Sequence, residues 1–434
     1  MSSVLTNGFR CQVTGLLALL LVGPPAWAQH LDPHHARDLS RAEPEAVGLS
    51  ASRLERLAAG MQQVVDDGGL SGVVTMVARN GRLAFADAVG VQDIESGQPM
   101  ALNTLFRIWS MTKPVTGVAL MMLYEEGKWQ LNDPVSDYIP EFSDLRVYVG
   151  EQAAGSPATE PATRSMTMLE LMTHSGGLDY GGADAVGQMY QEHGVPNPDA
   201  PLQTLIDDLS QLPLREKPGT SYHYSVSVDV QGYLVEKLSG QPFDEFLLTR
   251  IFEPLGMEDT GFFVPVGDVD RAARTYRATE DGLELTGDIR TLPPTGPMGG
   301  QGLYSTAGDY LRFAQMLLNG GVLDDAQLLS PRTVQMMRTN HLADGPLRTL
   351  PSTHVFGRGH GLGWGLDFEV VMDAAAAGEP TRDGTFYWLG AAGTWFWIDP
   401  ASDLVFVGMI QHFGDAAREV YDKSRNLVYQ ALTR

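Results

Sequence analysis

The clearest chemical pattern in the sequence is a serine followed three positions later by a lysine, Ser110-Met111-Thr112-Lys113. A serine hydroxyl is a poor nucleophile until a neighbouring base takes its proton. A lysine among apolar residues loses part of its affinity for a proton, so it can act as that base. At helical spacing the two side chains lie within reach of each other. The tetrad predicts nucleophilic catalysis, although a capping serine and a lysine that reaches solvent would also explain it.

Other well-known catalytic and nucleotide-binding patterns are missing. The sequence contains no G-x-S-x-G, H-E-x-x-H, G-x-x-x-x-G-K-[ST] or G-x-G-x-x-G motif. The usual α/β-hydrolase, metalloprotease and nucleotide-binding sites are therefore excluded. The histidines are scattered without metal-ligand spacing, so we expect no metal and no other cofactor.

Composition narrows the possible partners. The chain has 434 residues, of which 43% are hydrophobic and 19% charged, which is typical of a globular protein with a large core. The 53 acidic residues outnumber the 30 basic ones, giving a formal net charge of −23. Nucleic-acid binding needs clustered Lys and Arg, and the sequence has no basic run. We therefore expect no nucleic-acid partner.

The first 28 residues resemble a secretory signal peptide. An apolar stretch follows Arg10, and the small-x-small triplet Ala26-Trp27-Ala28 marks a cleavage site. The apolar stretch is too short for a membrane span, which needs about 20 residues, so we expect no stable span after cleavage. We expect a periplasmic or secreted protein, cleaved after Ala28. The only cysteine, Cys11, lies in this segment, so disulfides and thiol catalysis are excluded for the mature chain 29–434.

Regular patterns at both ends of the mature chain predict one antiparallel sheet with helices on its faces. Expected helices cover residues 50–67, 115–123, 305–319 and 415–432, and expected strands cover 73–79, 82–91, 385–389, 394–399 and 404–411. Asn80-Gly81 between the first two strands favours a type I′ turn. Residues 115–123 are apolar nearly all round, which is typical of a helix inside the fold.

Between these ends, residues 132–294 show short helical patterns, frequent Pro and Gly, and long connections. Such a region is typical of a pocket wall. The sequence predicts an α+β fold in which residues 43–131 and 295–434 form the sheet and its helices, with 132–294 as a largely helical insertion.

The sequence resembles the serine hydrolases built like class C β-lactamases and the related DD-peptidases, and more closely their esterase branch, the family VIII carboxylesterases. The similarity runs from about Glu43 to the C-terminus. It is carried by the tetrad with Phe106-Arg107-Ile108 before it, and by Leu171–Leu178, Tyr224-Ser225-Val226 with Asp229-Val230, Ile251–Met257 and Gly300–Asp309. The resemblance implies a β-lactamase/transpeptidase-like fold.

The resemblance also implies roles for individual residues. Ser110 would be the acylated nucleophile and Lys113 its proton partner. Tyr224 matches the tyrosine of the family's Y-x-N element, which passes the proton to the leaving group and later activates water. Tyr222 lies two residues away, but the serine after Tyr224 favours Tyr224. His174 is expected to be a structural hydrogen-bonding residue.

The family's K-T-G element falls on Trp388-Leu389-Gly390. The resemblance implies that this strand end lines the pocket, with Trp388 and Gly390 next to the substrate. The backbone N–H groups of Ala391 and Ser110 would form the oxyanion hole. Simple packing of Trp388 in the sheet is the alternative.

Two departures from the lactamase pattern bear on the substrate. Val226 replaces the asparagine of Y-x-N and offers no hydrogen bond to a substrate amide. Trp388 replaces the K-T-G cation that pairs with the carboxylate of β-lactams and D-alanyl peptides, and losing that pair costs about 1.5–3 kcal/mol. We therefore expect a serine hydrolase that cleaves small neutral esters with short to medium acyl chains. The alternatives are a β-lactamase or D-amino-acid-specific peptidase, an acyltransferase, and a non-catalytic acyl-binding protein of the same fold.

Overall fold

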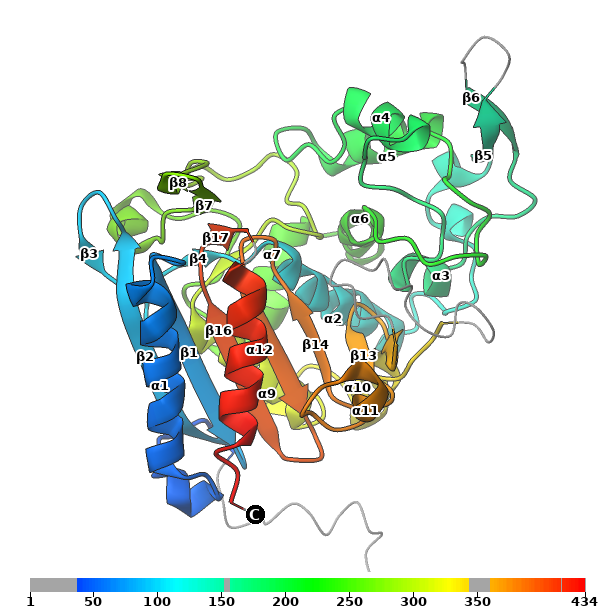
Figure 1. The fold of residues 1–434 in the computed structure, drawn as a ribbon. Helices are drawn as coiled ribbons and strands as arrows, with labels where there is room; N and C mark the ends of the chain where they lie inside the picture. Colours follow the sequence, from blue (N-terminus) through cyan, green and yellow to red (C-terminus); the bar gives the residue numbers. More distant parts are fainter. Residues whose placement is uncertain (1–36, 152–156, 343–359, 415, 434) are drawn as a thin grey trace, which may run out of the picture. The chain divides into compact units, whose positions relative to one another are not determined.

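Segments from both ends of the described chain form an eight-stranded antiparallel sheet (Figure 1). This computed structural model describes residues 37–151, 157–342, 360–414 and 416–433. The strand order β12-β13-β14-β15-β16-β1-β2-β3 places the first strand of the chain beside a C-terminal one. The predicted α+β fold with a sheet built from both ends is confirmed. The predicted signal peptide lies outside the described residues.

Most strands of the sheet follow the sequence prediction. The eight strands are β1 (Gly72–Arg79), β2 (Arg82–Asp93), β3 (Gln98–Pro99), β12 (Leu362–Trp364), β13 (Glu369–Val371), β14 (Phe386–Leu389), β15 (Trp395–Asp399) and β16 (Leu404–Met409). The two-residue strand β3 was not predicted. Asn80 and Gly81 both have positive φ, at 53° and 73°, as the predicted type I′ turn requires. The sequence analysis did not predict β12 and β13, because three-residue strands are too short to show a period of two.

Side chains alternate along β15, and each face of the sheet carries its own helix layer. Trp395 packs on Tyr421 of α12 (Ala416–Tyr429), with ring centroids 5.2 Å apart. Its neighbour Phe396 packs on Tyr310 of α9 (Ala307–Leu318) at 5.0 Å. Successive strand residues point to opposite faces, so α12 and α9 lie on opposite sides. Figure 1 shows α12 beside α1 (Ala51–Asp66), which it contacts.

Helix α2 (Thr112–Glu125) is the buried helix that the sequence predicts. Every residue from Thr112 to Leu123 is buried. It begins at Thr112, three residues before the predicted start, and Ser110 lies in a short 3-10 turn before it (Trp109–Met111). The reason is local: Trp109 has φ of 47°, outside the helical region, so the chain enters α2 through a tight turn.

The region between the two sheet-forming segments contains short helices and two small hairpins (Figure 1). Its helices are α3 (Met168–Met172), α4 (Ala185–Glu192), α5 (Leu202–Gln211), α6 (Ser227–Ser239), α7 (Phe243–Leu247), a π-helix (Leu248–Phe252) and α8 (Glu253–Leu255), and its hairpins are β5 (Arg146–Glu151) with β6 (Pro157–Pro161) and β7 (Tyr276–Thr279) with β8 (Gly282–Leu285). Helix α6 packs along α2, which brings the start of α6 close to Ser110 and Lys113.

Short elements complete the described chain. They are β4 (Phe106–Arg107) paired with β9 (Tyr304–Ser305), β10 (Val322–Leu323) with β11 (Ala326–Gln327), β17 (His412–Phe413), α10 (Pro331–Met337) and α11 (Ala374–Ala377). Among the described residues, no helix combines the length and apolar character that a membrane crossing requires.

Candidate active site

Ser110 and Lys113 meet where the tight turn passes into α2. The Lys113 Nζ atom lies 3.2 Å from the Ser110 Oγ atom. Lys113 is fully buried, whereas Ser110 is partly exposed. The serine can therefore meet a substrate while its lysine stays away from water. This arrangement contradicts the alternative in which Lys113 extends to solvent.

Two further groups fix the lysine amine. Nζ lies 2.9 Å from the Tyr180 hydroxyl and 2.7 Å from the backbone carbonyl oxygen of Gly300. A neutral amine has two N–H donors and one lone pair. If the donors go to Gly300 and Tyr180, the lone pair remains for the proton of the Ser110 hydroxyl. The geometry thus matches a base that is directed at its nucleophile.

Burial increases the share of neutral Lys113 near physiological pH. Loss of solvation lowers the pKa of Lys113 to about 8, although the Asp229 and Asp367 carboxyl groups oppose the shift. A base whose pKa lies close to the working pH transfers protons efficiently. Lys113 is therefore suited to take and return the proton of Ser110.

Asp229 connects the groups around the lysine. Its Oδ1 accepts a hydrogen bond from the Gly300 N–H at 2.9 Å, and its Oδ2 accepts one from the Tyr180 hydroxyl at 3.2 Å. Burial raises the pKa of Asp229, and the nearby Lys113 opposes that shift. Asp229 lies on α6, so this carboxyl group ties α6 to both partners of Lys113.

The structure separates the two candidate tyrosines. The Lys113 Nζ atom lies 4.6 Å from the centroid of the Tyr224 ring. Burial raises the pKa of the Tyr224 hydroxyl, while Ser110 and Trp388 act in the opposite direction. The Tyr222 ring instead packs against the Trp364 ring, with centroids 5.5 Å apart. Burial raises the pKa of its hydroxyl, and Glu369 and Asp367 add to this shift. Tyr224 is therefore the tyrosine beside the nucleophile.

The Tyr224 hydroxyl is buried and makes no well-aligned hydrogen bond to any residue that the structure describes. Its raised pKa keeps it protonated near neutral pH. A protonated hydroxyl next to Ser110 can donate to the oxygen of a leaving group, which reaches this position only when a substrate is bound.

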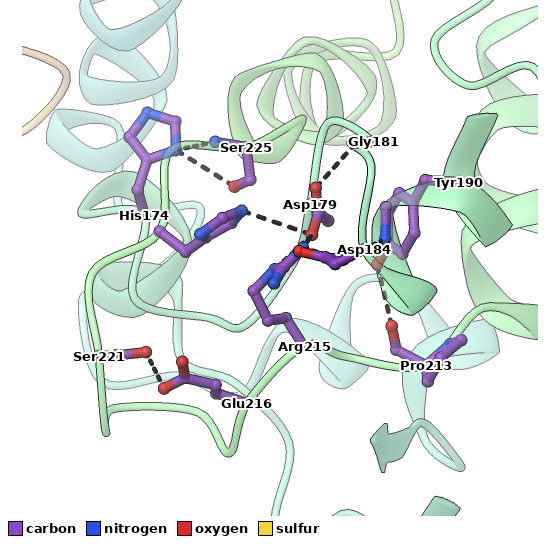
Figure 2. A network of polar contacts seen from close by, with 12 residues as sticks. His174, Asp179, Gly181, Asp184, Tyr190, Pro213, Arg215, Glu216, Ser221 and Ser225 are labelled. Carbon is purple, nitrogen blue, oxygen red and sulfur yellow. Dashed lines mark hydrogen bonds and ion pairs between the residues drawn. The ribbon is translucent and has the colours of Figure 1, made fainter. Parts of the chain in front are cut away.

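His174 contacts both Tyr224 and the residue that follows it. Figure 2 shows the His174 ring directed at Ser225, whose backbone N–H lies 3.2 Å and whose Oγ lies 3.3 Å from Nδ1. The His174 ring also packs on the Tyr224 ring, with centroids 4.7 Å apart. His174 has φ of 53°, which is rare for a non-glycine residue. The predicted structural role of His174 is confirmed.

A second polar cluster holds the loop that carries Tyr180. The buried Asp179 carboxylate contacts Arg215 and accepts a hydrogen bond from the Gly181 N–H at 2.8 Å (Figure 2). Burial would raise the pKa of Asp179, but His223, Gly181 and Arg215 outweigh it and lower the pKa to about 2. Because Asp179 precedes Tyr180 directly, this ion pair fixes the tyrosine's backbone.

Trp388 and Gly390 lie at the end of β14, as the sequence predicts, but the indole is only 1% exposed. Its ring packs edge-on against Trp364 at 4.6 Å and against Tyr224 at 5.3 Å. Trp388 therefore supports Tyr224 from within the core and offers no open face in the free protein. Contact of Trp388 with a substrate stays a prediction.

Gly390 brings the strand end against the nucleophile turn. A Cβ atom at Gly390 would collide with the Ile108 carbonyl oxygen and the Thr394 hydroxyl. The Thr394 hydroxyl donates to the Ile108 carbonyl oxygen at 3.2 Å. The Gly390 N–H donates to the Thr394 carbonyl oxygen at 2.7 Å. These contacts place the exposed Ala391 close to the turn that carries Ser110.

The sequence did not predict that Tyr180 and Gly300 contact the Lys113 amine, or that Asp229 holds both of them. Asp229 and Gly300 belong to segments that carry the family resemblance, and Tyr180 follows the Leu171–Leu178 segment by two residues. None of these residue types at that spacing indicates contact with a lysine. Among the described residues, no group of His, Cys, Asp or Glu side chains is arranged to hold a metal ion.

Comparison with known proteins agrees with this geometry. Residues 57–431 match the family described as Beta-lactamase. The chain belongs to the Beta-lactamase family. It is 40% identical to Protein Rv1367c of Mycobacterium tuberculosis over 368 residues, covering 82% of this chain and 90% of that protein. It is 32% identical to Esterase EstB of Burkholderia gladioli over 387 residues, covering 83% and 91%.

The fold of this Beta-lactamase family member also matches solved structures. EstCE1, described as a hydrolase with promiscuous acyltransferase activity, superposes with a TM-score of 0.74 at 28% identity, covering 87% of this chain and 98% of EstCE1. Family, fold and esterase relatives together make this chain a serine hydrolase of the β-lactamase fold. The predicted resemblance is confirmed.

Proposed function

We propose that this protein is a carboxylesterase that works through an acyl-enzyme on Ser110. The observation that carries the proposal is the buried Lys113 amine, 3.2 Å from the Ser110 hydroxyl and with its pKa lowered to about 8. A neutral lysine at this distance can take the serine proton as Ser110 Oγ attacks an ester carbonyl. The relatives named as esterases support this activity.

The remaining steps use the same residues. The backbone N–H groups of Ser110 and Ala391 stabilise the oxyanion of the tetrahedral intermediate. When the intermediate collapses, the ester C–O bond breaks, and Tyr224 gives its proton to the leaving alkoxide. Lys113 returns the serine proton to Tyr224. Water then attacks the acyl-enzyme, loses a proton through Tyr224 to Lys113, and the carboxylic acid leaves as Ser110 regains its hydrogen.

The substrate class follows from two side chains. Val226 and Trp388 are buried and apolar at positions where the lactamase pattern has an asparagine and a cation. A β-lactam or a D-alanyl peptide loses a hydrogen bond and an ion pair here, whereas a neutral ester with a short to medium acyl chain loses neither. We propose esters as the preferred substrates over β-lactams and D-amino-acid peptides.

Acyl transfer is a second candidate, because EstCE1 is described as having promiscuous acyltransferase activity. Transfer uses the same acyl-enzyme, with an alcohol in place of water. Supplying a primary alcohol with the ester and measuring the new ester against the free acid separates the two. We also propose that the protein acts in the periplasm or outside the cell after cleavage behind Ala28, which N-terminal sequencing of the exported protein would test.

Hydrolysis of p-nitrophenyl acetate and butyrate tests the main proposal. The wild type should hydrolyse both, and Ser110→Ala should abolish the activity. Ser52→Ala, a change on the exposed start of α1, is the matched control and should keep it. A chromogenic cephalosporin assayed in parallel should be hydrolysed much more slowly than either ester. Comparable rates on the cephalosporin would favour a β-lactamase.

A further inference from the structure

Arg107 holds a fixed position three residues before the nucleophile. It ends β4, and Gln411 clamps its backbone: Gln411 Oε1 accepts from the Arg107 N–H at 2.8 Å, and Gln411 Nε2 donates to the Arg107 oxygen at 3.3 Å. The Arg107 guanidinium lies 3.7 Å from the centroid of the Trp109 ring. Trp109 directly precedes Ser110, so this stacking holds a cation against the residue next to the nucleophile.

This cation has no anionic partner in the described part of the chain. Its Nε atom is buried without a hydrogen-bond acceptor. Burial lowers the pKa of Arg107; Tyr304 opposes this shift, and the neighbouring Arg290 adds to it. A partly desolvated charge without a partner is costly, and the buried Arg425 is paired with Glu379. The Arg107 surroundings therefore favour an anion supplied from outside.

Two adjoining cavities meet at Arg107. One is lined by Arg107 together with Arg290 and Gln301. The other has a volume of about 120 Å³ and is lined by Arg107, Trp109 and Arg274, with Asp288 also on its wall. Gln301 follows Gly300, which contacts Lys113, and Trp109 precedes Ser110. Each cavity is therefore lined by a residue that adjoins the catalytic residues in the chain, and each carries two arginines.

We propose that Arg107, assisted by Arg274, binds a carboxylate carried by the ester substrate. A guanidinium matches the planar carboxylate with two parallel hydrogen bonds. The formal charge of −23 makes the molecule as a whole unattractive to anions, so such a substrate needs a local cationic site. The cation that the lactamase pattern has at position 388 is missing, and Arg107 supplies one three residues before Ser110. This inference rests on the proposed esterase function.

Matched ester pairs test the inference. Mono-p-nitrophenyl glutarate against p-nitrophenyl pentanoate places the carboxylate on the acyl side, and 4-acetoxybenzoate against phenyl acetate places it on the alcohol side. For each pair, the preference is the kcat/KM of the charged ester divided by that of the neutral ester. In at least one pair, this preference should be at least tenfold higher in the wild type than in Arg107→Gln. Arg107→Lys should retain part of the ratio. Arg250→Gln, on an exposed ion pair with Glu126, is the control and should leave it unchanged.

A ratio that Arg107→Gln leaves within twofold of the wild type in both pairs would overturn the inference. If that variant does not fold, inhibition of the wild type decides: free glutarate should compete with p-nitrophenyl pentanoate, and uncharged glutaramide should not. Equal inhibition by both compounds would again overturn the proposal. If the wild type shows no Ser110-dependent ester hydrolysis, the proposed function itself is refuted. Failure of the carboxylate proposal can therefore be told apart from failure of the proposed function.

Discussion

At the scale of single residues, the catalytic proposal depends on the protonation state of one amine. Lys113 is buried with two carboxyl groups nearby, and burial still dominates, so its pKa falls to about 8. The Tyr224 pKa moves upward. These opposite shifts agree with the proposed roles, in which Lys113 is the base and Tyr224 is the proton donor.

The pH dependence of activity should follow the lysine. Neutral Lys113 becomes more populated as pH rises through its pKa of about 8, so kcat/KM for p-nitrophenyl butyrate should rise and then level off. Below this pKa, each unit of pH should lower kcat/KM about tenfold. Lys113→Arg should lose the activity, because a guanidinium stays protonated. A profile that is flat between about pH 6 and 9 would exclude Lys113 as the base.

The two neighbouring tyrosines offer a matched comparison. Tyr224→Phe removes the hydroxyl beside Ser110 and should lower kcat by about 10²–10⁴-fold, the usual contribution of a general acid–base group. Tyr222→Phe removes the hydroxyl of a ring that packs on Trp364, and should keep most of the activity. Steady-state kinetics on both variants checks this, and a larger loss in Tyr222→Phe would reverse the assignment.

At the scale of elements, the site is a meeting of a helix start, a strand end and two loops. Helix α2 supplies Lys113, the end of β14 approaches the Ser110 turn, and loops supply Tyr180 and Tyr224. The close approach at Gly390 is what allows the strand end to reach Ile108. The oxyanion hole proposed between Ser110 and Ala391 requires this contact.

A methyl group at Gly390 should therefore separate the two backbones. Gly390→Ala meets the Ile108 oxygen and the Thr394 hydroxyl, both parts of this contact, so we expect kcat to fall at least tenfold and the melting temperature to drop. Gly267→Ala is the control, because a Cβ there meets open space and Gly267 has an ordinary φ. Activity in Gly390→Ala equal to that of Gly267→Ala would argue against an oxyanion hole at this position.

The sequence predicted those features that depend on residues close together in the chain. The β1–β2 hairpin was predictable because Asn80-Gly81 specifies its turn, and α2 because its apolar residues form an unbroken run. Ser110 and Lys113 are close in the chain, so their contact was also predictable. The approach of Tyr180 and Gly300 to Lys113 joins residues far apart in the sequence, and only the packing of α6 along α2 determines it.

At the scale of the whole molecule, a buried ionic cluster joins the C-terminal helix to the outer strands. Arg425 of α12 pairs with Glu379, and both side chains are almost fully buried, at 7% and 0% exposed. The Tyr387 hydroxyl of β14 donates to Glu369 of β13 at 2.9 Å and lies near Glu379. The cluster therefore links α12, β13 and β14, although it lies away from the catalytic residues.

Breaking this cluster should destabilise the fold. Arg425→Met leaves the Glu379 carboxylate buried without its cation, and we expect the free energy of unfolding to fall by about 3–5 kcal/mol. Arg250→Met removes an exposed ion pair with Glu126 and should cost only about 0–1 kcal/mol. Urea unfolding of the two variants measures the difference. Equal stabilities would show that the buried pair contributes no more than a surface pair.

The central claim is that Ser110 is a nucleophile activated by Lys113, and covalent labelling tests it most directly. The protein is treated with an active-serine fluorophosphonate probe, digested and mapped by mass spectrometry. We predict a single adduct on Ser110 in the wild type, none at this position in Ser110→Ala, and labelling of Ser110 slowed at least a hundredfold in Lys113→Ala. An unlabelled Ser110 in the wild type, or equal labelling rates with and without Lys113, would contradict the account.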